Sequence, residues 1–60
     1  MLQDFKNDFE KEYPYIYYQD YINDSEILEF LELNIDRPYK VLLNQFNDFV
    51  ISQGKCEVQE

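Results

Sequence analysis

The 60-residue sequence is rich in carboxylate and tyrosine side chains and contains no histidine. Without histidine, the chain has neither a histidine general base nor a Ser-His-Asp triad. Its single cysteine, Cys56, lies near the end of the chain with no histidine to activate it. Carboxylate pairs of the glycosidase type are present, but a short helical chain offers little room for a pocket of about 300 Å³ or more. We therefore expect no enzyme activity and no catalytic residue.

The ligand types also argue against a bound metal or cofactor. One cysteine and no histidine disfavour a Cys/His zinc site, and a lone cysteine cannot form a disulfide within the chain. The segment Asn23-Asp24-Ser25-Glu26 lacks the glycine and the distal glutamate of an EF-hand calcium loop. We expect no metal site and no cofactor.

Carboxylates recur at helical spacing in two segments, and they indicate binding rather than catalysis. The two rows are Asp4, Asp8 and Glu12, and Glu26, Glu29 and Glu32. Such spacing places each row along one side of a helix, with Cβ atoms about 5–6 Å apart. Duplex DNA carries one charge per ~1.7 Å of axis, so one row is too sparse to imitate DNA. Two rows side by side, with Asp20 or Asp36 between them, come closer to the charge density of DNA. The simpler interpretation is that each row is only a solvated helix face.

Five of the six tyrosines fall within residues 13–22. Tyrosine is favoured at interfaces because its ring is apolar and its hydroxyl is polar, although core packing is the simpler interpretation of the cluster. Leu33 stands among the glutamates of the second row and is either harmlessly exposed or a contact residue. The predicted partner-binding residues are Asp4, Asp8, Glu12, Tyr15, Tyr17, Asp20, Tyr21, Glu26, Glu29, Glu32, Leu33 and Asp36.

The net charge of −8, from thirteen acidic and five basic residues, limits the partners. A surface this acidic repels phosphate backbones and anionic lipids, so we expect neither direct nucleic-acid binding nor membrane binding. A protein with a basic surface is the favoured partner. The sequence has no apolar run of signal-peptide or transmembrane type, which predicts a cytoplasmic location.

Apolar side chains at three- and four-residue spacing predict three helices. They span residues 2–12, from a cap near residue 23 to about residue 34, and from about residue 38 to about residue 53. The fold class we predict is all-α, a small bundle of three or four short helices. Eleven aromatic side chains supply the buried area that so short a chain needs. We predict one domain at residues 1–54 and a frayed tail at 55–60.

Several residues mark the expected helix ends. Asn23 and Glu26 have the spacing of a capping box at the start of the second helix. Asp36 is expected to cap the third helix, with Pro38 in its first turn. Gly54 fits the position after its end, where a left-handed backbone is needed.

The segment 15–22, which follows Pro14, has two interpretations. As a helix, it would place Tyr15, Tyr18 and Ile22 on one face. As a strand, it would turn two sets of side chains to opposite faces. These sets are Tyr15, Tyr17 and Tyr21, and Ile16, Tyr18 and Ile22. A strand needs a partner, and residues 55–58 are the candidate; we favour the helix.

These observations predict a small acidic inhibitor that occupies a basic, nucleic-acid-binding surface of a host protein, as a DNA mimic does. The abundant residue types have AT-rich codons, which is typical of an AT-rich bacterial or phage genome. The alternative is a homodimeric, adaptor or antitoxin-type regulatory protein that binds through its aromatic and apolar face. Salt separates the two, because it screens exposed charges beyond about 10 Å at 0.1 M and leaves apolar contacts in place.

Overall fold

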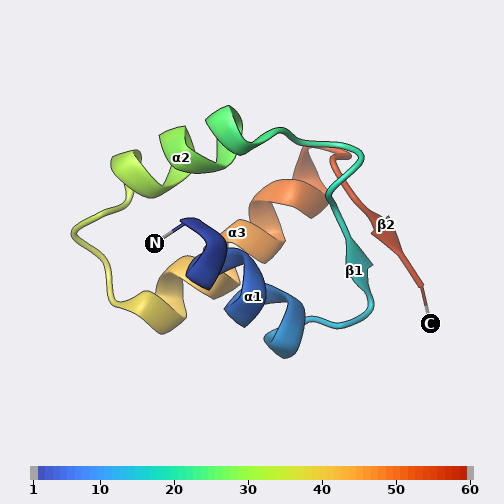
Figure 1. The fold of residues 1–60 in the computed structure, drawn as a ribbon, viewed down its shortest axis with the longest axis horizontal. Helices are drawn as coiled ribbons and strands as arrows, with labels where there is room; N and C mark the ends of the chain where they lie inside the picture. Colours follow the sequence, from blue (N-terminus) through green and yellow to red (C-terminus); the bar gives the residue numbers. More distant parts are fainter. Residues whose placement is uncertain (1, 60) are drawn as a thin grey trace.

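The computed structural model describes residues 2–59, which form three helices and a short two-stranded ribbon (Figure 1). The helices are α1 (Leu2–Glu12), α2 (Asp24–Leu33) and α3 (Tyr39–Ser52), and the strands are β1 (Ile16–Tyr17) and β2 (Glu57–Val58). The predicted class, a small bundle of short helices, is confirmed. Residues 1 and 60, at the ends of the predicted domain and tail, lie outside the described residues.

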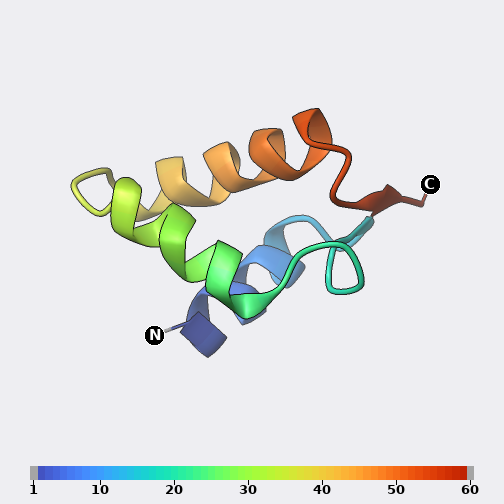
Figure 2. The same ribbon diagram turned by 90° about the horizontal axis from the view of Figure 1, so that it is seen from above.

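The ribbon lies at one end of the bundle and the α2–α3 turn at the other (Figures 1 and 2). The molecule measures 31 × 20 × 20 Å along its principal axes. No helix within residues 2–59 has both the length and the apolar character needed to cross a membrane.

One aromatic ring, that of Phe46 on α3, joins the whole core. It is fully buried, and its centroid lies 4.9–6.2 Å from those of five other rings, mostly in edge-to-face geometry. These rings belong to Phe5, Phe9, Tyr18, Phe30 and Phe49. Because they come from α1, α2, α3 and the segment after β1, a single side chain ties every helix to the core.

Two of the predicted helix ends are confirmed. The Asn23 side chain accepts a hydrogen bond from the Glu26 N–H at 2.9 Å, and the Asn23 N–H donates to the Glu26 carboxylate at 3.4 Å, which completes the capping box. At the end of α3, Gly54 has a φ of 65°. Its N–H donates to the Ile51 carbonyl at 3.2 Å, and the next N–H donates to the Val50 carbonyl at 2.8 Å. This pair of bonds is a Schellman motif.

The predicted N-cap of α3, Asp36, is wrong. The helix begins at Tyr39, and Pro38 takes the cap position with a ψ of 145° and no side-chain hydrogen bond. Asp36 is exposed in the α2–α3 turn instead of capping the helix. A cap at Asp36 would require Arg37 to be helical immediately before a proline, a conformation that the proline ring disfavours.

The helical interpretation of residues 15–22 is also wrong: residues 16–17 form a strand, and turns lie before and after it. Pro14 begins a turn that the Ile16 N–H closes by donating to the Tyr13 carbonyl at 3.1 Å. β1 then pairs antiparallel with β2, so that Ile16 lies opposite Val58. The tail, predicted to be frayed from residue 55, therefore contains a strand at residues 57–58. Backbone pairing with β1 holds the tail strand in place, and β1 is itself fixed by Ile16, which is 3% exposed.

The strand and the turn that follows it give the segment 15–22 two different sides. Its inward side chains, Ile16, Tyr18 and Ile22, are at most 5% exposed. Its outward side chains, Tyr15, Tyr17 and Tyr21, are 45–49% exposed. This alternation is the one that the strand interpretation predicted, and it places three tyrosines on the surface together.

Candidate functional site

The three outward tyrosines form a surface that we call the tyrosine face, defined as Tyr15, Tyr17, Asp20, Tyr21 and Glu57. Tyr17 and Glu57 are opposite each other across the ribbon, and the Tyr21 hydroxyl donates a hydrogen bond to the Glu57 carboxylate at 3.3 Å. The negative charge of Glu57 raises the pKa of Tyr21. The tyrosine face thus combines half-exposed rings with two carboxylates, of which Glu57 accepts a hydrogen bond from Tyr21.

Tyr18 is buried in the same segment and links it to α1. Its ring is 1% exposed, and its hydroxyl donates to the Glu10 carboxylate at 3.2 Å. The Gln19 side chain donates to the same carboxylate at 2.7 Å. Burial, and then the charge of Glu10, raise the pKa of Tyr18. These contacts anchor the turn that carries Asp20 and Tyr21 to α1.

The first carboxylate row, on α1, is partly engaged in the fold. The Tyr39 hydroxyl donates a hydrogen bond to Asp8. Burial, followed by the contact with Asp8, raises the pKa of Tyr39 to about 12. Asp4 adds to this shift, and Glu12 is exposed at the end of the helix. The row therefore lies on the flank of α1 that faces the start of α3.

The second row, on α2, is also divided. Glu26 accepts a hydrogen bond from the Lys55 ammonium at 2.7 Å, and this contact, with the capping bond from Asn23, lowers the pKa of Glu26. Glu29 and Glu32 are both exposed, and they border different hollows of the surface. Glu29 borders a shallow hollow beside α3, whereas Glu32 borders a larger groove on the α1 side.

The two rows do not lie side by side. The flank of α1 that faces α2 carries Lys6, which forms an ion pair with Asp24 at 3.1 Å. The acidic row of α1 is on its other flank, toward Tyr39. The structure therefore does not bring the two carboxylate rows together in the way that DNA mimicry by adjacent rows would require. The acidic surface that remains follows the chain: residues 12–36 contain seven carboxylates and no lysine or arginine.

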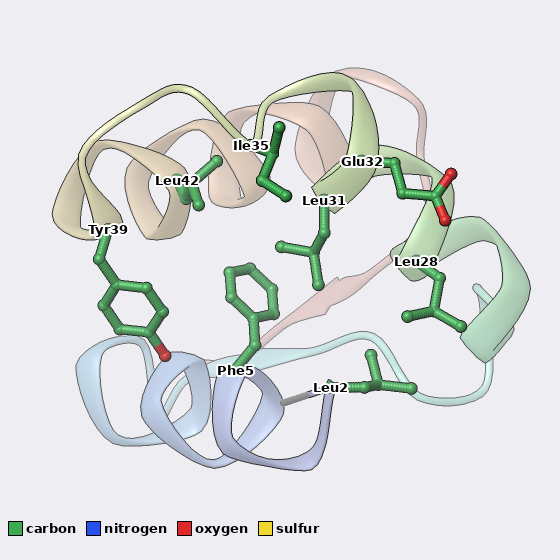
Figure 3. A pocket seen from close by; sticks show the side chains of 8 residues that line it. All are labelled: Leu2, Phe5, Leu28, Leu31, Glu32, Ile35, Tyr39 and Leu42. Atoms are coloured by element: carbon green, nitrogen blue, oxygen red, sulfur yellow. The ribbon is translucent and has the colours of Figure 1, made fainter.

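A feature that the sequence reasoning missed is an apolar groove of about 270 Å³ between the three helices (Figure 3). Its lining residues are Leu2, Phe5, Leu28, Leu31, Glu32, Ile35, Tyr39 and Leu42. Leu28 and Tyr39 belong to the apolar faces of α2 and α3, yet they are 44% and 46% exposed. Ile35, an apolar residue in a turn, is 71% exposed, and it was the sequence signal for this groove.

The remaining predicted residues lie at the margins. Leu33 is 75% exposed and borders the hollow beside Glu29, and Asp36 lies in the α2–α3 turn. The structure thus gathers Tyr15, Tyr17, Asp20 and Tyr21 into one surface. It assigns Asp8 and Glu26 to contacts that hold the fold together.

Within residues 2–59, no group of three or more His, Cys, Asp or Glu side chains is arranged to hold a metal ion. Cys56 is half-buried, and burial raises the pKa of its thiol, which disfavours the reactive thiolate. No family model, curated protein or solved structure matches this chain.

Proposed function

We propose that this protein is a small inhibitor that binds a basic surface of a partner protein, a surface that otherwise holds nucleic acid. The observation that carries the proposal is the acidic, tyrosine-bearing surface of the segment 12–36. The segment has seven carboxylates, of which Asp24 and Glu26 pair with Lys6 and Lys55, and three tyrosines that are 45–49% exposed. An electrostatic partner for such a surface is rich in lysine and arginine.

The tyrosine face is complementary to a phosphate-binding site on a partner protein. Arginine side chains that hold phosphate form bidentate hydrogen bonds with carboxylates and stack on aromatic rings. Asp20 and Glu57 supply the carboxylates, and Tyr15, Tyr17 and Tyr21 supply the rings. A cation over a tyrosine ring contributes about 0.5–1 kcal/mol at an exposed site. Several such contacts together give an affinity that falls with salt.

The structure also selects the residues to test. Glu26 and Asp8 make contacts within the fold, so their replacement would change stability as well as charge. Asp20 and Glu29 are exposed. Asp48, on the exposed side of α3, is a matched control for charge reversal, because it is an exposed acid outside the proposed surface.

The experiment is capture of proteins from a bacterial lysate on the immobilised chain and on four variants. We expect Asp20→Lys, Glu29→Lys and Tyr17→Ala each to reduce recovery of the captured nucleic-acid-binding protein several-fold. Asp48→Lys, with the same change in charge as the two reversals, should leave recovery unchanged. Equal recovery by all four variants would contradict the proposal. So would a partner whose retention depends on none of the exposed carboxylates.

A further inference from the structure

We infer that the apolar groove is a second, separate docking site, which binds an amphipathic helix of a partner protein. The helix inserts a ridge of apolar side chains between α1, α2 and the start of α3, and it carries lysine or arginine beside that ridge. This inference does not depend on the tyrosine face, because none of the lining residues belongs to it.

The groove has the size and lining of a site for apolar side chains. At ~30 Å³ for each water-sized atom, its 270 Å³ has room for about nine heavy atoms, or two leucine side chains. The polar groups along it are few: among the described lining residues, Glu32 alone carries a charge. Water in such a hollow finds few hydrogen-bond partners, so apolar side chains displace it favourably. Two leucines one helical turn apart fit this shape.

Contacts on both sides hold the groove open. Lys6 and Asp24 form their ion pair at the α1–α2 seam, one turn along each helix from the lining residues Leu2 and Leu28. On the other side, the Tyr39 ring packs edge-to-face on Phe5 with a centroid distance of 6.3 Å. The Tyr39 hydroxyl is bonded to Asp8 in addition. A groove fixed in this way needs little rearrangement to accept a helix.

The charges around the groove set the chemistry of the occupant. Glu32 lies on the α2 wall, and Asp8 lies beside Tyr39 on the opposite side. Arg37 and Lys40 are exposed near Tyr39, but neither lines the groove. With carboxylates on two sides and a net charge of −8 on the chain, a helix with basic residues beside its apolar ridge is complementary.

Shape and charge both disfavour a second copy of this chain as the occupant. A two-fold dimer with its axis at the groove would place groove against groove, and two concave surfaces leave both hollows unfilled. A standard interface also buries about 800 Å² of each partner, or about a fifth of the 4282 Å² surface of this chain. Two copies of charge −8 would in addition repel each other.

The probe for this site is a fluorescent amphipathic peptide of about 14 residues, or ~four helical turns. It carries two leucines at positions i and i+4 and lysines on both flanks. Its control is the same peptide with both leucines replaced by alanine, which keeps the charge and does not lower the helix propensity. Fluorescence anisotropy with the full chain measures both affinities. We expect the leucine peptide to bind more tightly, by on the order of tenfold for each leucine buried.

Variants of the chain locate the binding. Ile35→Asp places a carboxylate in the groove, and we expect it to weaken the leucine peptide at least about tenfold. Leu33→Asp is the matched control, because Leu33 is similarly exposed but lies outside the groove. Tyr17→Ala should leave peptide binding unchanged, so failure here is distinguishable from failure of the tyrosine face. Circular dichroism of each variant confirms that it is folded.

Three results would overturn the inference. The first is equal binding of the leucine and alanine peptides, which would mean that charge alone attracts them. The second is equal loss of binding with Ile35→Asp and Leu33→Asp. The third is self-association of the chain in sedimentation equilibrium that Ile35→Asp abolishes, which would make a second copy the occupant.

Discussion

Replacement of Phe46 by alanine removes the ring on which the core converges. Phe46 is fully buried and lies 4.9–6.2 Å from five other rings. A buried Phe→Ala change costs about 3–5 kcal/mol, and edge-to-face pairs worth ~0.5–1.5 kcal/mol each place this site at the upper end. At about 0.05–0.15 kcal/mol per residue, a domain of this size has roughly 3–9 kcal/mol of stability in total. We therefore expect Phe46→Ala to remove most or all of it.

Urea denaturation followed by far-ultraviolet circular dichroism measures the effect. Phe46→Leu keeps most of the buried volume and should remain folded, with a loss smaller than that of alanine. Ile51→Ala is the control on the same helix; Ile51 is 48% exposed, so its loss should stay within about 0.5 kcal/mol. A Phe46→Ala protein within about 1 kcal/mol of the wild type would refute the convergence of the core on this ring.

Three further predictions concern the contacts that close the fold. Lys55 and the capping bond hold the pKa of Glu26 below 4.5, so its contribution to stability is complete above that pH and is lost as the pH falls through the lowered pKa. In urea denaturation at pH 7, Glu26→Gln should thus have a lower free energy of unfolding than the wild type, and the difference should disappear at acidic pH. A difference that does not change with pH would contradict this assignment. Gly54→Ala should lower the free energy of unfolding by about 1–2 kcal/mol in the same assay, because a side chain is strained at a φ of 65°. No atom lies within 4 Å of the new Cβ, so the cost comes from the backbone alone. An unchanged midpoint would rule out the left-handed turn. Truncation after Lys55 removes β2 and also Cys56, which packs against the core, and we expect a loss of about 1–2 kcal/mol in thermal denaturation, whereas a frayed tail could be removed without effect.

The sequence predicted the features that depend on neighbours a few residues apart. The spacing of Phe5 and Phe9 located α1, and both residues are buried. The Asn23–Glu26 pair located the start of α2 and Gly54 the end of α3, because capping boxes and left-handed turns are set by the residues that form them. The outward alternation of the tyrosines was likewise implicit in residues 15–22.

The errors came from distant contacts. Residues 16–17 form a strand because residues 57–58 pair with them; residues 55–58 were the candidate partner, but no local pattern decides whether such a distant pairing forms. The roles of Asp8 and Glu26 depend on Tyr39 and Lys55, which are 31 and 29 residues away along the chain. The groove was missed for the same reason. A helical wheel shows that Leu28 is on an apolar face, but only the packing of three helices shows that this face is left uncovered.

The most direct test of the proposed function is displacement of the captured partner by duplex DNA. If the acidic surface occupies a nucleic-acid site, the partner should elute from the immobilised chain at moderate salt, and added DNA should release it in proportion to its concentration. A partner that stays bound at high salt and in the presence of excess DNA would contradict the proposal.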